Sequence, residues 1–117
     1  MTISAVIITF NEEDRITKCL ESLQWVDEII IVDSYSTDNT VSLCKNFTNQ
    51  VYQRNFKSYG DQKRYALTKA SSNWVLSIDA DEVISEPLKK RIIALLEHDP
   101  SYPVSYTHLT LPTKRIV

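Results

Sequence analysis

The chain has 117 residues, enough for one domain, with 43% hydrophobic and 24% charged residues, as in ordinary globular proteins. Its net charge of −2 argues against a nucleic-acid-binding surface built on bulk positive charge. No apolar run approaches the roughly 20 residues that a membrane helix needs, and a single glycine, Gly60, excludes P-loop and dinucleotide-binding fingerprints.

Residues 3–10 are the first predicted element, a strand buried on both faces. The stretch is apolar apart from Ser4 and Thr9, is rich in β-branched residues, and stops at Asn11. Asn11 is expected to cap a following helix, with Asp14 as the acidic part of a capping box. The apolar face of that helix follows helical spacing: Ile16, Cys19, Leu20 and Leu23.

The middle of the chain repeats this order. Residues 28–32 are predicted to form a second buried strand, which Asp33 ends before a polar turn and a short helix. Residues 51–52 suggest a third strand, and residues 61–71 a helix. Cys19 and Cys44 are expected to be small buried apolar residues in a reducing compartment, with a disulfide left open.

A strand-like run at residues 74–78 ends in two carboxylates, Asp79 and Asp81. Strand side chains alternate, so these two positions point the same way. Oxygen-only ligands suit Mg²⁺ or Mn²⁺, although a bare Asp-x-Asp is more often an acidic turn before a helix. Ser85 is expected to cap a last helix, with Pro87 in its first turn.

Alternating strands and helices predict an α/β fold with a mostly parallel sheet and flanking helices. Ligands bind such sheets beyond the carboxyl ends of the strands. Acid, hydroxyl and amide groups follow the strands there: Thr9, Asn11, Glu12, Asp33, Asp79 and Asp81. Their gathering favours a ligand site over simple solvation.

The segment 104–117 breaks the pattern, since it shows neither helical nor strand periodicity. Residues 104–113 resemble the translation of a transposase-type sequencing adapter. On that resemblance we expect a native domain over residues 1–103 and a non-native tail over residues 104–117. A genuine β-like C-terminal segment is the alternative.

Four stretches carry a resemblance to a known family: AVIITFNEE at 5–13, VDEIIIVDS with STDNT within 26–40, YGDQK at 59–63, and WVLSIDADE at 74–82. Together they resemble the family-2 inverting glycosyltransferases of the GT-A fold, in particular the bacterial β-1,4-glucosyltransferase type that acts on lipopolysaccharide core. The resemblance implies a partial, truncated GT-A (Rossmann-like) domain that binds a nucleotide sugar.

The resemblance also implies roles for single residues. The nucleotide-sugar-binding set would be Thr9, Phe10, Asn11, Glu12, Asp33, Lys63 and Asp79. Asp33 would accept a hydrogen bond from uracil, and Lys63, with Arg64 as a second candidate, would approach the nucleotide. Asp79 would face the ribose, and Asp81 would hold Mn²⁺ or Mg²⁺ on the diphosphate.

Simpler roles stay open for several of these residues. Asp33 could only cap the following turn, and Lys63 could be a solvated helix charge. Glu12 could compensate a helix dipole. Asp38 is expected to be a cap rather than a ligand.

Inversion needs a general base at the acceptor hydroxyl. The family places this base in a later part of the domain, so the catalytic residue is unknown here, and Glu82 is not assigned to the role. We therefore expect a fragment of marginal stability that binds donor but transfers sugar poorly. Its expected partners are a UDP-hexose donor and a saccharide or glycolipid acceptor, with no nucleic acid.

The expected location is cytoplasmic, with at most peripheral association at the inner face of the inner membrane. Two other functions stay open. One is a non-catalytic nucleotide-binding α/β module, and the other is a different aspartate- and magnesium-dependent α/β enzyme. The second would need an acid pair after the first strand, where this chain has Thr-Phe-Asn-Glu at 9–12.

Overall fold

The computed structural model describes residues 2–98, 109–111 and 115–116. Strands and helices alternate along most of it. Their bounds are β1 (Ile3–Thr9), α1 (Ile16–Glu21), β2 (Glu28–Asp33), α2 (Thr40–Cys44), β3 (Val51–Gln53), α3 (Tyr59–Lys69), β4 (Trp74–Asp79), α4 (Glu86–His98), β5 (Leu109–Leu111) and β6 (Arg115–Ile116).

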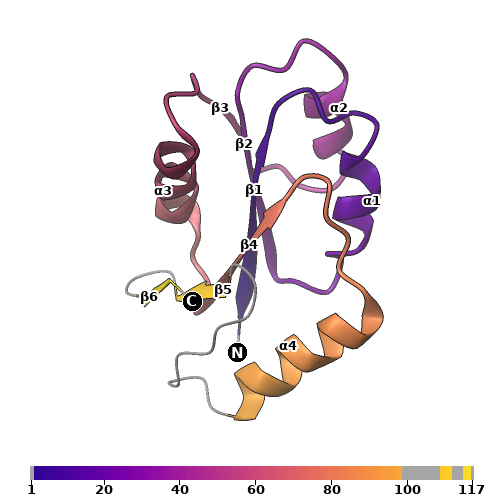
Figure 1. Ribbon diagram of the computed structural model, residues 1–117, viewed down its shortest axis with the longest axis vertical. Coiled ribbons are helices and arrows are strands. Elements are labelled where there is room, and N and C mark those ends of the chain that lie inside the picture. Colours follow the sequence, from indigo (N-terminus) through magenta and orange to yellow (C-terminus); the bar gives the residue numbers. More distant parts are fainter. Residues whose placement is uncertain (1, 99–108, 112–114, 117) are drawn as a thin grey trace.

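The described strands form one sheet in the order β3-β2-β1-β4-β5-β6. The pairs among β1 to β4 are parallel, whereas β5 pairs with β4 and β6 with β5 in the antiparallel sense. Helix α3 lies on one side of the sheet, and α1 and α2 lie on the other (Figure 1). This arrangement confirms the predicted α/β class with a mostly parallel sheet and flanking helices.

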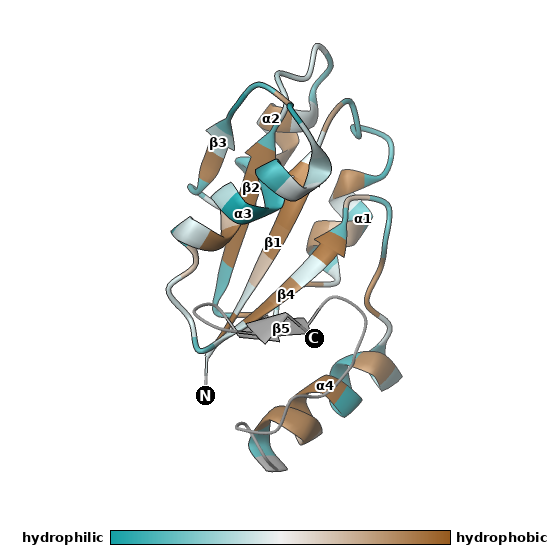
Figure 2. Ribbon diagram, turned by 60° about the vertical axis from the view of Figure 1, so that its left-hand side comes forward, coloured by the Kyte–Doolittle hydropathy of each residue, from teal (hydrophilic) through white to brown (hydrophobic). Residues whose placement is uncertain are grey.

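Both faces of the central strands are buried, as their continuous apolar sequences predict. On β1, Ala5 and Ile7 join a core that includes α1, while Val6 joins a second core with Ala66 of α3. Figure 2 shows the resulting band of hydrophobic residues along β1, β2 and β4. Alternate side chains of one strand therefore hold helices against opposite faces of the sheet.

The predicted start of the first helix is wrong. Helix α1 begins at Ile16 rather than beside Asn11, and its N-cap residue, Arg15, makes no side-chain cap hydrogen bond. Asn11 has a φ of 51°, whereas N-cap residues usually have extended backbone. Its side-chain oxygen instead accepts the Thr37 N–H at 2.8 Å.

The starts predicted for the later helices, and the apolar face predicted for the first helix, agree with the structure to within two residues. Helix α3 begins at Tyr59, two residues before the predicted start, because the Ser58 side chain caps it by accepting the Asp61 N–H. The Ser85 hydroxyl accepts the Leu88 N–H at 3.3 Å, which confirms its role as a cap. The predicted apolar face of the first helix is buried throughout: Ile16, Cys19, Leu20 and Leu23.

Both cysteines, Cys19 and Cys44, are buried free thiols, as predicted. Burial, followed by nearby acidic charge, raises the pKa of each thiol to about 12. They therefore act as small apolar core residues and not as reactive groups.

The segment predicted to be a non-native tail contributes β5 and β6. Strand β5 pairs with β4 through Val75 opposite Thr110 and Leu76 opposite Leu109. The rest of this segment lies outside the described residues. The non-native origin of residues 104–117 stays a prediction.

One carboxylate ties several chain segments together at the amino edge of the sheet. Glu28, at the start of β2, accepts hydrogen bonds from the Ser4 hydroxyl at 2.7 Å and the Gln50 amide at 2.8 Å. It also accepts the N–H and hydroxyl of Ser71 at 3.0 and 3.1 Å. Burial alone would raise the pKa of Glu28, but these hydrogen bonds outweigh it and hold the pKa below its usual range.

Replacing Glu28 with alanine should lower the free energy of unfolding by about 2 kcal/mol, because donors to a charged acceptor lose their partner. Since the folded pKa is depressed, this stabilisation is present above the unfolded pKa of about 4.3 and fades as the pH falls through the folded value. Urea unfolding at pH 7 and pH 3 would measure it. The difference between the variants should be larger at pH 7 than at pH 3.

The matched control is Glu21→Ala, which removes an exposed glutamate from α1. It should change the free energy of unfolding by no more than about 0.5 kcal/mol at either pH. Equal effects of both substitutions at pH 7 would show that the Glu28 hydrogen bonds do not stabilise the fold.

Candidate functional site

Polar groups from three neighbouring strands meet at the carboxyl edge of the sheet. Strand β1 lies between β2 and β4, and the parallel register pairs Thr9 with Asp33 and Ile8 with Asp79. Asp79 and Asp81 are both exposed, while Ala80 between them is buried. The strand ends therefore line up, and both aspartates are exposed where the chain leaves β4.

The same edge carries the large exposed hydrophobic side chains of the described part of the chain. They lie in the segments that follow β1, β2, β3 and β4: Phe10, Tyr35, Phe56, Tyr59 and Val83. Exposed apolar groups that gather in one place mark interaction sites. Here Phe10 and Phe56, each just over half exposed, line a cavity of about 290 Å³ together with Ser34.

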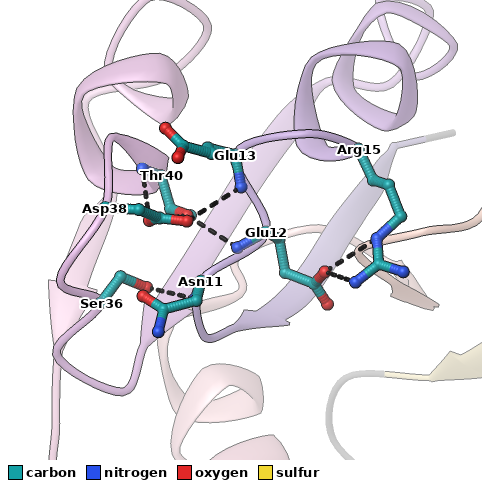
Figure 3. A network of polar contacts seen from close by, with 7 residues as sticks. All are labelled: Asn11, Glu12, Glu13, Arg15, Ser36, Asp38 and Thr40. Carbon is teal, nitrogen blue, oxygen red and sulfur yellow. Dashed lines mark hydrogen bonds and ion pairs between the residues drawn. The ribbon is translucent and has the colours of Figure 1, made fainter.

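The loop after β1 is joined to the loop after β2. The Asn11 N–H donates to the Ser36 hydroxyl, and the Glu12 N–H to the Thr40 hydroxyl, both at 2.8 Å (Figure 3). The Glu13 N–H donates to Asp38 at 3.3 Å. These bonds fix the two loops against each other.

Asp38 accepts hydrogen bonds at the start of α2, as a cap does, but the N-cap residue of that helix is Asn39. The Asp38 carboxylate accepts both the N–H and the hydroxyl of Thr40, the first residue of α2. Burial raises the pKa of Asp38, but the hydrogen bonds from Thr40 and Glu13 lower it overall.

Glu12 also has a local partner. Its carboxylate accepts hydrogen bonds from Arg15 at 2.6 and 3.1 Å, and Arg15 remains largely exposed (Figure 3). At this edge Glu12 thus forms an ion pair with Arg15. Its role toward a ribose stays a prediction.

Asp33 is buried below the carboxyl edge of the sheet and is not exposed on it. Its side chain is fully buried, and it accepts the Thr9 hydroxyl at 2.7 Å. The N–H and hydroxyl of Ser36 donate to it at 2.8 and 2.6 Å. Asp33 therefore does cap the turn after β2, and a hydrogen bond from uracil would require part of this arrangement to open.

Helix α3 brings Tyr59 and Lys63 to the end of β4. The Tyr59 hydroxyl donates to Oδ1 of Asp79 at 2.7 Å, and the Lys63 ammonium lies 5.2 Å from the centre of the Tyr59 ring. Burial, then the hydrogen bond to Asp79 and its charge, raise the pKa of Tyr59. The structure thus places the predicted Lys63 and Asp79 on either side of one tyrosine.

Two residues of this edge were not predicted as site residues. Tyr59 belongs to the YGDQK stretch, but its sequence position gives no sign of a partner 20 residues away. Gln62 is fully buried and donates to the Ser34 hydroxyl at 3.2 Å and to the Arg54 carbonyl at 3.1 Å. The sequence signal that could have indicated the buried role of Gln62 is its uncharged amide in the first turn of a short amphipathic helix.

The carboxylates suit a metal that is shared with a ligand. Within the described ranges no three His, Cys, Asp or Glu side chains form a cluster that could hold a metal. Mg²⁺ usually keeps several waters and takes one or two carboxylates together with substrate phosphates. Two exposed aspartates one residue apart fit that donor set.

No helix in the described part of the chain is long and apolar enough to cross a membrane.

Comparisons with known proteins agree with this architecture. Residues 4–109 match the family described as Glycosyl transferase family 2. The lipopolysaccharide core biosynthesis glycosyltransferase LpsC of Rhizobium meliloti (strain 1021) is 39% identical over 101 residues, which is 82% of this chain and 37% of LpsC.

Two solved structures are also similar. S. aureus TarS in complex with UDP-GlcNAc has a TM-score of 0.72 and 26% identity, over 92% of this chain and 38% of that chain. M. tuberculosis glucosyl-3-phosphoglycerate synthase in complex with Mg²⁺ and UDP has a TM-score of 0.68 and 27% identity, over 82% and 39%.

These structures are GT-A glycosyltransferases, which confirms the predicted fold. This chain spans little more than a third of the length of LpsC. The family match covers residues 4–109, nearly all of the chain. This chain therefore belongs to Glycosyl transferase family 2.

Proposed function

We propose that the carboxyl edge of this sheet binds a UDP-sugar through a divalent metal, as the donor-binding part of an inverting hexosyltransferase. The observation that carries this proposal is the exposed Asp79–Asp81 pair on the same edge as an aromatic cavity. Support also comes from the complexes of TarS with UDP-GlcNAc and of the synthase with Mg²⁺ and UDP. The name of LpsC supports lipopolysaccharide or another cell-envelope glycan as the product.

The cavity between Phe10 and Phe56 suits the uracil ring. An aromatic face stacks on a base, and the Ser34 hydroxyl supplies a polar group at the same place. The loop that carries Phe10 is already tied down through Asn11 and Glu12. Little ordering entropy is then lost on binding.

The end of β4 suits the ribose and diphosphate. Asp79 would face the ribose, and Asp81 would hold Mg²⁺ or Mn²⁺. Such an ion, when bound, acts as a Lewis acid and template that stabilises a diphosphate leaving group. The Lys63 ammonium, on the same side as Tyr59 and Asp79, adds a positive charge toward the nucleotide.

The contacts of Glu82 fit a structural role in the turn after β4 better than the role of a general base. Its carboxylate accepts the Asp79 N–H at 2.8 Å, and its own N–H donates to the Asp79 carbonyl at 2.9 Å. These bonds shape the turn after β4. The acceptor, a saccharide or glycolipid, and the base that activates it would belong to the whole protein, as would any peripheral membrane contact.

Asp81→Ala tests the metal role. UDP should bind the unsubstituted chain in the presence of Mn²⁺ or Mg²⁺, and the affinity should fall at least about tenfold in Asp81→Ala or in EDTA, because the diphosphate then loses its counter-charge. Calorimetric titration with UDP would measure this. Asp14→Ala, which removes another exposed acid from the same edge, should bind as the unsubstituted chain does.

Unchanged affinity in Asp81→Ala would refute the metal role of that residue. UDP binding that survives EDTA in full would instead favour a non-catalytic nucleotide-binding module.

Phe10→Ala tests the base site. It should weaken UDP and uridine by a similar factor, about tenfold, because the lost stacking does not involve the phosphates. Phe10→Tyr keeps the aromatic face and should retain the affinity within about twofold. Competition titrations with both ligands would measure the factors. A loss for UDP but not for uridine would place Phe10 away from the base.

A further inference from the structure

We propose that Tyr59 is a positioning residue for the donor site, which holds Asp79 through its hydroxyl and Lys63 through its ring. This inference rests on the proposed function of the same edge. Nothing in the sequence motifs assigns Tyr59 a role. The contacts around it, however, join the two elements that carry Asp79 and Lys63.

The hydroxyl contact fixes a carboxylate that is otherwise free to rotate. The backbone of Asp79 is already held by Glu82, through hydrogen bonds of 2.8 and 2.9 Å. Its exposed side chain, by contrast, is held by the Tyr59 hydroxyl, at 2.7 Å from Oδ1. That distance is typical of a strong O–H···O⁻ hydrogen bond. Removing the hydroxyl would let the carboxylate sample other rotamers.

The contact leaves room for a ligand. Tyr59 uses Oδ1 of Asp79, and among residues 2–98 no hydrogen bond to Oδ2 is found. A ribose hydroxyl could therefore donate to Oδ2 while Tyr59 stays in place. The geometry points to a contact that holds Asp79 ready for binding and does not block it.

The ring holds the lysine. Lys63 lies one helical turn after Tyr59, and its ammonium is 5.2 Å from the ring centre. This is within the range of about 6 Å for a cation–π contact. The start of α3 is itself fixed, since Ser58 caps it and Arg54 pairs with Asp61. Tyr59 thus sits on a rigid support.

A role in core packing does not explain this tyrosine. Its side chain is 42% exposed, and it belongs to neither hydrophobic core cluster. Its specific contacts are with Asp79 and Lys63, both proposed donor-binding residues.

The test compares Tyr59→Phe with Tyr65→Phe in the full 117-residue chain. Both substitutions remove one hydroxyl from α3, but Tyr65 lies on the face of the helix that packs against β3 through Tyr52. Calorimetric titration with UDP and Mn²⁺ should show an affinity about fivefold lower in Tyr59→Phe and unchanged in Tyr65→Phe. The melting temperature should stay within about 2 °C in both.

Tyr59→Leu separates the two contacts. It removes the ring as well as the hydroxyl, so it should weaken UDP further than Tyr59→Phe does, by about tenfold or more in total. Equal losses in the two variants would overturn the part of the inference that concerns Lys63.

The outcomes distinguish this inference from the proposed function. If the unsubstituted chain binds UDP but Tyr59→Phe binds equally well or more tightly, the positioning role is refuted and the donor site stands. If the unsubstituted folded chain does not bind UDP, the proposed function fails and the inference fails with it.

Discussion

The site depends on the parallel register of β1 between β2 and β4. That register sets Thr9 beside Asp33 and Ile8 beside Asp79, so three polar strand ends finish at one edge. A shift of one residue would turn each buried apolar side chain of these strands to the opposite face. Since both faces are packed against helices, the apolar core and the polar edge are specified by the same pairing.

Two kinds of side chain occupy this edge: those that are hydrogen-bonded within the chain and those that are exposed to solvent. Asp33 and Gln62 are buried and Asp38 is half-buried, and their hydrogen bonds within the chain hold the loops after β2 and β3 and the start of α3. Asp79, Asp81 and the exposed aromatic rings face solvent. A buried layer of satisfied hydrogen bonds thus supports an exposed layer that is open to a ligand, which is how precise binding sites are usually built.

The strands, and the sheet edge at which their polar ends gather, could be predicted from sequence, because long apolar runs are a local signal. The run before Asn11 and the run before Asp79 each became a buried strand. The backbone conformation and the hydrogen-bond partners of single polar residues could not be predicted. Asn11 took a left-handed backbone because its partner, Thr37, comes from a loop 26 residues away. Gln62 resembles a solvent-facing helix residue until Ser34 and Arg54 surround it.

Asn11 and Tyr35 both have positive φ angles, of 51° and 60°, although neither is glycine. Left-handed backbone costs roughly 1–2 kcal/mol at a residue such as Tyr35 and less at Asn11, because asparagine adopts it more readily. Glycine would remove that cost, yet the chain has a single glycine, at position 60. Glycine would also widen the range of conformations open to both turns. The carboxyl edge of the sheet therefore contains locally strained turns that are also stiff. Substitutions at positions 11 and 35 that relieve the strain and raise thermal stability should weaken the selectivity of ligand binding at this edge.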